Sequence, residues 1–147
     1  MTDLFPPPSE QVAVAWLKAV LAPFDAVGNT LPATGSWPDG FVQALVVGGT
    51  PLVDIPVRQA LVAVDAWYAT PSSSTKPQWG KASVLIERVR LATEAPGYAR
   101  QVALPANYRP AYVSSAFVRV EPRRIPDDAG AFAHLSMDVE LHWREAS

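Results

Sequence analysis

The chain contains no cysteine, little charge and no long apolar run. Among its 147 residues the cysteine count is 0, which excludes disulfides, thiolate metal sites and cysteine nucleophiles. Charged residues make up 18%, against about 25% in a typical domain. The net charge of −2 argues against a broad nucleic-acid surface. No stretch approaches the ~18 apolar residues of a membrane span, and residues 1–10 lack a signal-peptide pattern. We therefore expect no membrane segment.

Apolar residues and proline are abundant instead. Apolar side chains account for 49% of the chain, and there are 15 prolines. A chain of this length is the size of one domain and can bury a core without covalent links. We therefore predict a single domain over residues 1–147 with short, firmly ended elements. Residues 1–8, which contain three consecutive prolines, are expected to form an extended arm.

Two segments have the apolar spacing of helices. The first covers residues 10–22, with Ser9 as its expected N-cap. Its main apolar face consists of Val12, Ala13, Trp16, Leu17 and Val20. Further apolar residues lie off that face, which predicts deep burial or a second packing partner. The second helix is predicted at residues 78–94, and its core stripe consists of Trp79, Ala82, Leu85, Ile86 and Val89.

Four longer segments and one short one are expected to be strands. The short one lies within residues 26–31, and the others cover 41–47, 57–68, 111–121 and 131–144. Segment 57–68 is apolar on both faces, which predicts a central place in the sheet. Segment 131–144 alternates, with seven apolar odd residues from Ala131 to Trp143 and polar even residues from His134 to Arg144. With a loop at 122–130, the last two strands would form a long hairpin.

The order of these elements predicts the fold class. The helices are too few to connect a parallel sheet. We therefore expect an α+β fold, a mainly antiparallel β-sheet packed with two α-helices and ending in the long hairpin.

No set of residues predicts catalysis, a metal or a cofactor. His134, Asp138 and His142 are spaced four apart, and on a strand such neighbours lie ~13 Å from each other at ~3.3 Å per residue. One ion cannot reach all three. The Gly80-Lys81 pair resembles a phosphate-binding loop but lacks its preceding glycine and following hydroxyl. No nucleophile motif is present, and we expect a protein that is not an enzyme.

The expected hairpin loop carries charges of both signs. Arg123-Arg124 would face Asp127-Asp128 across the tip. One interpretation is a local salt-bridged turn. The other is a projecting arm whose charges meet those of a neighbouring copy. On the second interpretation the candidate subunit contacts are Arg119, Glu121, Arg123, Arg124, Asp127 and Asp128.

The chain resembles the tail terminator (tail completion) proteins of long-tailed bacteriophages, especially those of actinobacterial phages. Three stretches carry the resemblance: the opening helix at 10–21 followed by 27–32, the segment 41–68, and the closing hairpin ending at 137–144. Segment 41–68 contains a Val-Val-Gly-Gly strand end and a strand closing in Asp-Ala-Trp-Tyr-Ala. These motifs are apolar patterns with a few polar anchors.

The resemblance implies a structural role. Proteins of this family form a ring, commonly a hexamer, that caps the tail tube, stops its polymerisation and presents a surface to the head-side connector. The implied partners are copies of itself, the tail tube protein and the head–tail connector protein. No membrane and no sequence-specific nucleic acid is implied, with DNA able to pass through the ring. The implied location is the tail or neck of the virion, after assembly in the host cytoplasm.

Two other functions stay open from the sequence. One is another phage neck protein, a head-completion or connector subunit. The other is a monomeric α+β domain that binds a small molecule or catalyses a reaction.

Overall fold

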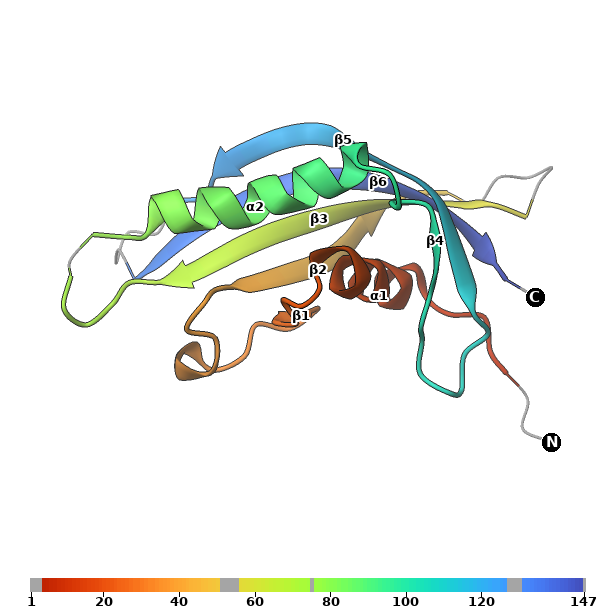
Figure 1. Cartoon of the computed structure of the whole chain (residues 1–147), viewed down its shortest axis with the longest axis horizontal. Coiled ribbons are helices and arrows are strands. Elements are labelled where there is room, and N and C mark those ends of the chain that lie inside the picture. Colours follow the sequence, from red (N-terminus) through yellow and green to blue (C-terminus); the bar gives the residue numbers. More distant parts are fainter. Residues whose placement is uncertain (1–3, 51–55, 75, 127–130, 147) are drawn as a thin grey trace.

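A computed structural model describes residues 4–50, 56–74, 76–126 and 131–146, which form one sheet and two helices (Figure 1). The helices are α1 (Ser9–Leu21) and α2 (Trp79–Glu94), and a 3-10 turn, η1, covers Thr34–Ser36. The strands are β1 (Val27–Gly28), β2 (Phe41–Gly48), β3 (Arg58–Ala69), β4 (Arg100–Val102), β5 (Ala111–Arg124) and β6 (Phe132–Glu145).

The sheet has the order β1-β2-β3-β6-β5-β4. All neighbours are antiparallel except β1, which pairs with β2 in parallel. The predicted α+β class, the two helices and the closing β5–β6 hairpin are confirmed. The central place predicted for segment 57–68 is also confirmed, because β3 lies between β2 and β6. The short strand β4 was not predicted.

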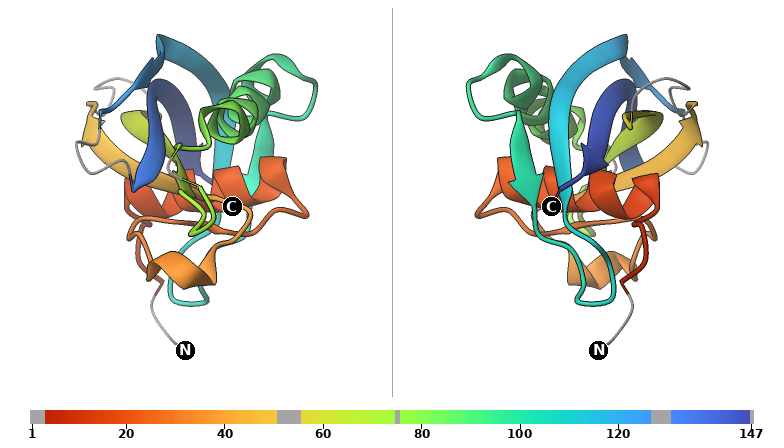
Figure 2. Two further views of the ribbon diagram at one scale, coloured as in Figure 1. Left: turned by 90° about the vertical axis from the view of Figure 1, so that its left-hand side faces the viewer. Right: turned by 90° about the vertical axis from the view of Figure 1, so that its right-hand side faces the viewer.

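Both helices pack on the same face of the sheet, which curls around them (Figure 2). Trp16 of α1 meets Val62 of β3 and Val139 of β6. The residues of α2 that are buried in the same core are Ala82, Leu85, Ile86, Val89 and Thr93. Each fully buried large aliphatic side chain contributes about 1.5–3 kcal/mol. Over the described residues, neither helix is long and apolar enough to cross a membrane.

The longest regular pairing joins β3 to β6. Its register runs without interruption from Arg58 opposite Trp143 to Ala69 opposite Phe132. The predicted odd residues of β6 are buried from Ala133 to Trp143, and those from Leu135 to Leu141 pair with the buried even residues Ala60 to Ala66 of β3. Ala131, the first of the predicted series, precedes the strand and is exposed. The alternation in sequence thus predicts the buried face correctly.

The N-terminus of α1 differs from the sequence prediction. Pro8 occupies the N-cap position in an extended conformation, and no side chain caps the helix. Ser9 is the first helical residue instead, and its hydroxyl accepts a hydrogen bond of 3.0 Å from the indole of Trp143. Trp16 donates through its indole to the carbonyl oxygen of Tyr98 at 2.8 Å. The helix is therefore held by the sheet on one side and by the segment after α2 on another.

The first helix also covers part of the outer side of β2. β1 pairs only with Val42 and Gln43 of that strand. Further along, the amide of Val46 donates to Glu10 of α1 at 3.3 Å. The other carboxylate oxygen of Glu10 accepts from Asn29 at 3.0 Å.

Strand β5, which was predicted at 111–121, does not alternate regularly between its two faces. Its pairing with β6 is interrupted between Val113 and Ser115, between Val118 and Val120, and between Val120 and Arg123. Each interruption inserts a residue and shifts the alternation of faces. The buried residues are consequently Ala111, Val113 and then Ala116.

Substitution of Leu135 by alanine should destabilise the fold. Leu135 is 7% exposed, and large-to-small changes in a core cost about 2–5 kcal/mol. Chemical denaturation would measure the loss. Leu45, which is 37% exposed on β2, supplies a control in Leu45→Ala. An equal loss for both variants would contradict the assignment of β6 odd residues to the core.

Candidate functional site

The face of the sheet opposite the helices carries the charged side chains of the central strands. Four charge contacts lie on it: Asp65–His134 at 3.2 Å, Glu140–His142 at 2.6 Å, Arg119–Glu140 at 3.7 Å and Arg123–Asp138 at 4.0 Å. The side chains of the three carboxylates are only 15–18% exposed. The two arginines are 57% and 48% exposed. This uncovered face therefore holds partly buried acids beneath exposed cations.

The two histidines contact different carboxylates. The ring of His134 stacks on Trp67 with 3.6 Å between centroids. Its Nε2 atom lies 3.2 Å from a carboxylate oxygen of Asp65, without the alignment of a hydrogen bond. His142 lies farther along β6 beside Glu140.

The predicted spacing of His134, Asp138 and His142 does not gather them. Each of the three lies beside a different side chain on the uncovered face. Within the described residues, no three His, Asp or Glu side chains are placed to hold a metal ion.

The predicted contact residues on β5 are exposed, and the three arginines each have a partner within the chain. Arg119 and Arg123 pair with acids of β6. Arg124 lies over the ring of Trp79, 4.6 Å from its centroid, and links β5 to α2. Glu121 lines a hollow between α2 and β5.

The prediction that 122–130 is a loop is wrong at its start. β5 continues to Arg124, and Ile125 still donates to the carbonyl of His134 at 2.8 Å. The cause is the bulge between Val120 and Arg123. A bulge accommodates Pro122, which has no amide proton for a regular ladder. Asp127 and Asp128 lie outside the described residues, so their predicted contact with the arginines stays a prediction.

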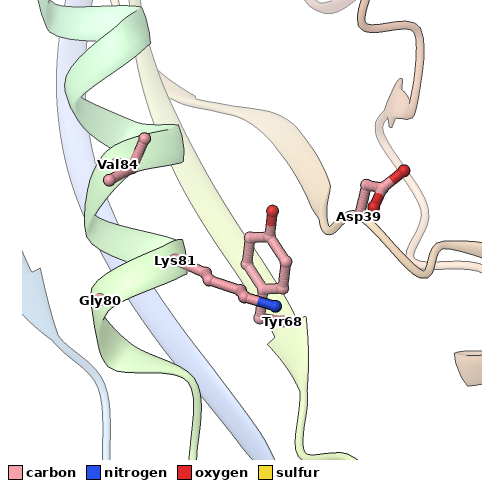
Figure 3. A pocket seen from close by; sticks show the side chains of 5 residues that line it. All are labelled: Asp39, Tyr68, Gly80, Lys81 and Val84. Carbon is pink, nitrogen blue, oxygen red and sulfur yellow. The ribbon is translucent and has the colours of Figure 1, made fainter.

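A hollow of about 360 Å³ lies at the start of α2, where Gly80 and Lys81 resemble part of a phosphate-binding loop (Figure 3). Its lining consists of Asp39, Tyr68, Gly80, Lys81 and Val84. Lys81 extends from α2 toward Tyr68, and Asp39 lies on another wall (Figure 3). A carboxylate in the lining opposes anion binding, because like charges repel.

Tyr68 is held against the backbone in this hollow. Gly40 has φ +93°, and a Cβ atom there would lie 2.6 Å from the Tyr68 ring. Glycine is thus required on both conformational and steric grounds. Burial raises the pKa of the Tyr68 phenol, and the charge of Asp39 raises it further, while Arg88 lowers it. The phenol stays protonated at neutral pH and is no nucleophile.

Comparison with known proteins gives no family: no protein-family model matches the chain, and no curated protein does. The geometry of the described residues is therefore the basis for assigning a role. The uncovered face presents paired charges on its central strands.

Sequence reasoning missed the contacts of Asp65, Trp67 and His134. These residues belong to two strands that are far apart in the chain. The alternation of apolar and polar residues along each strand predicts that all three side chains lie on the same face of the sheet. Only the β3–β6 register, with Trp67 opposite His134, brings them together.

Tyr68 should make stability depend on alkaline pH. With a raised pKa in the folded state, the unfolded chain loses the phenol proton first as pH rises. The stability contributed by this group is complete below pH ~10 and is lost as pH rises through the folded pKa. Tyr68→Phe should flatten the fall of the thermal midpoint in this range, and Tyr112→Phe serves as the control. An unchanged pH profile in Tyr68→Phe would contradict the effect.

Proposed function

We propose that this protein is a tail terminator, a structural subunit that forms a ring on the tail tube of a long-tailed bacteriophage. The ring stops tube polymerisation and joins the tail to the head-side connector. The sequence resemblance suggests this role. The observation that carries it in the structure is the sheet face that neither helix covers.

The side chains on that face are not those of a surface that contacts only water. An antiparallel sheet that faces water normally presents polar residues there. Here the strands that flank the central charge contacts expose large apolar side chains: Leu45 is 37% exposed, Phe117 37% and Val120 44%. Large apolar side chains that are exposed together on one face mark a site of contact with other proteins, and exposed charges beside them give such a contact its specificity.

The charged residues of β5 suit a contact between subunits. Arg119 and Arg123 lie exposed above acids that are partly buried. Their guanidinium groups can reach a neighbour's carboxylate while their own acids stay compensated. Together with Glu121 and Arg124, they are the proposed ring or tube contacts.

The proposed assembly has a ring, commonly of six subunits in the family, as its working form. A ring uses two different patches per subunit, joined head to tail. Its other proposed partners are the tail tube protein below and the connector protein above. The proposed activity is mechanical and uses no cofactor.

Neutralising the β5 arginines should weaken the ring. The double variant Arg119→Gln with Arg123→Gln removes both charges without placing new acids beside Glu140 and Asp138. Loss of such charge pairs should weaken association by about tenfold, equivalent to about 1.4 kcal/mol. Sedimentation would measure assembly, and electron microscopy of phage carrying the variant should show tails of uncontrolled length or tails without heads.

The exposed Lys81, which lies on α2, provides a matched control in Lys81→Gln. The control should assemble normally. Deletion of the whole protein from the phage tests the proposal directly. If the resulting tails have normal length and join heads, the protein is not a tail terminator.

A further inference from the structure

The N-terminal arm exposes two large apolar side chains. Leu4 is 42% exposed and Phe5 is 61% exposed. The arm is nevertheless fixed to the body, because Phe5 donates to the Asn107 carbonyl at 3.0 Å and accepts from the Arg109 amide at 2.9 Å. A fixed arm carries its apolar side chains at a defined place, so docking them loses little conformational entropy.

A groove lies between the C-terminal half of α2 and β5. It has a volume of about 280 Å³ and is lined by Arg90, Thr93, Glu94, Phe117, Val118 and Glu121. β4 pairs only with residues Ala111, Tyr112 and Val113 of β5. Over the rest of the described β5, no strand pairs with its outer side. The groove thus combines apolar side chains with an open strand edge.

The rim of this groove is acidic. Arg90 is shared between Glu87 at 2.7 Å and Glu94 at 3.3 Å. The hydrogen bond to Glu87 raises the pKa of Arg90, and the charge of Glu121 raises it as well. Three carboxylates therefore surround one cation.

The end of the molecule that bears the arm has the opposite charge. Glu145 is shared between Arg109 at 3.1 Å and Arg58 at 4.0 Å. Arg144, the neighbour of Glu145 on β6, lies over the ring of Tyr112. Two cations therefore contact one carboxylate beside the fixed arm, and Arg144 adds a further cation to this end of the molecule. Groove and arm end are complementary in sign.

We infer that the arm of one copy, with Leu4 and Phe5, docks into the α2–β5 groove of a second copy. This inference rests on the proposed ring and adds the arm and the groove to the subunit contact proposed for Arg119 and Arg123, which lie on β5 like one wall of the groove. The arm lies at the lower right of Figure 1, beside the start of β5, whereas α2 and the later part of β5 lie at the top, and both views of Figure 2 keep the arm apart from α2. The two patches can therefore be occupied at once by different neighbours.

Charge opposes contacts between like patches. Arm against arm would bring the arginines together, and groove against groove would bring the carboxylates together, and both arrangements are repulsive. Arm against groove is attractive. It gives a ring when each arm enters the groove of the next copy, and a closed twofold dimer when two copies exchange arms. Sedimentation distinguishes the two, and a closed dimer of the unchanged chain would contradict the ring contact.

Two variants that each lose one patch test the inference. Phe5→Asp damages the arm, and the double change Glu94→Arg with Glu121→Arg damages the groove. At low ionic strength, each variant alone should be monomeric by sedimentation, whereas the unchanged chain forms rings. A mixture of the two variants should give a 1:1 heterodimer and nothing larger. The groove variant supplies the one intact arm, and the arm variant supplies the one intact groove.

Val47→Asp is the matched control, since Val47 is 58% exposed on β2, away from both patches. It should assemble as the unchanged chain does. Circular dichroism and the thermal midpoint should show that all variants are folded.

Rings from either variant alone, or rings from the mixture, would overturn the arm-to-groove contact and leave the proposed ring intact. An unchanged chain that stays monomeric at every concentration would also overturn it. If the groove variant forms rings but no longer joins tail tubes, the groove binds the tube protein and the inference is wrong. The tail-length assay decides the proposed function independently.

Discussion

The pairing of β3 with β6 is the interaction on which the other elements depend. Twelve consecutive residue pairs, from Arg58–Trp143 to Ala69–Phe132, join segments that are far apart in the sequence. This ladder brings the apolar residues of both strands to one face. It thereby creates the surface on which α1 and α2 pack, and neither helix has another core to join.

The same ladder also fixes the opposite face. Because side chains alternate along a strand, the register that buries Val62 against Val139 also sets Asp65 near His134. A shift by one residue would exchange the two faces completely. The position of the charge contacts is thus a consequence of core packing and needs no separate folding signal.

The sequence predicts most of the architecture, because strict alternation and helical spacing report directly on burial. β6 is the clearest case, with six buried odd residues from Ala133 to Trp143. The errors fall where local patterns carry no information. The bulges of β5 depend on which residues of β6 it faces, and Ser9 bonds to Trp143, a residue 134 positions away.

For the candidate site, the sequence points to the charged residues of the final hairpin but not to their partners. Arg124 stacking on Trp79 requires knowledge of how α2 lies on the sheet. The opposite charges of the arm end and the groove could not be predicted from the sequence either, because each patch combines residues of three or more segments. Such juxtapositions arise only from the tertiary fold.

The carboxylate of Glu10 at the amide of Val46 bears on how the outer edge of β2 is protected from pairing with other chains. A strand with free amides and apolar side chains is a template for uncontrolled aggregation, and β2 has both Leu45 and Val47 exposed. By occupying that amide, the helix side chain removes one donor that an incoming strand would need. On β5, the bulges and Pro122 have the same effect by breaking the regular spacing of donors. A protein with apolar surface can in this way accumulate to high concentration in a cell without forming amorphous deposits.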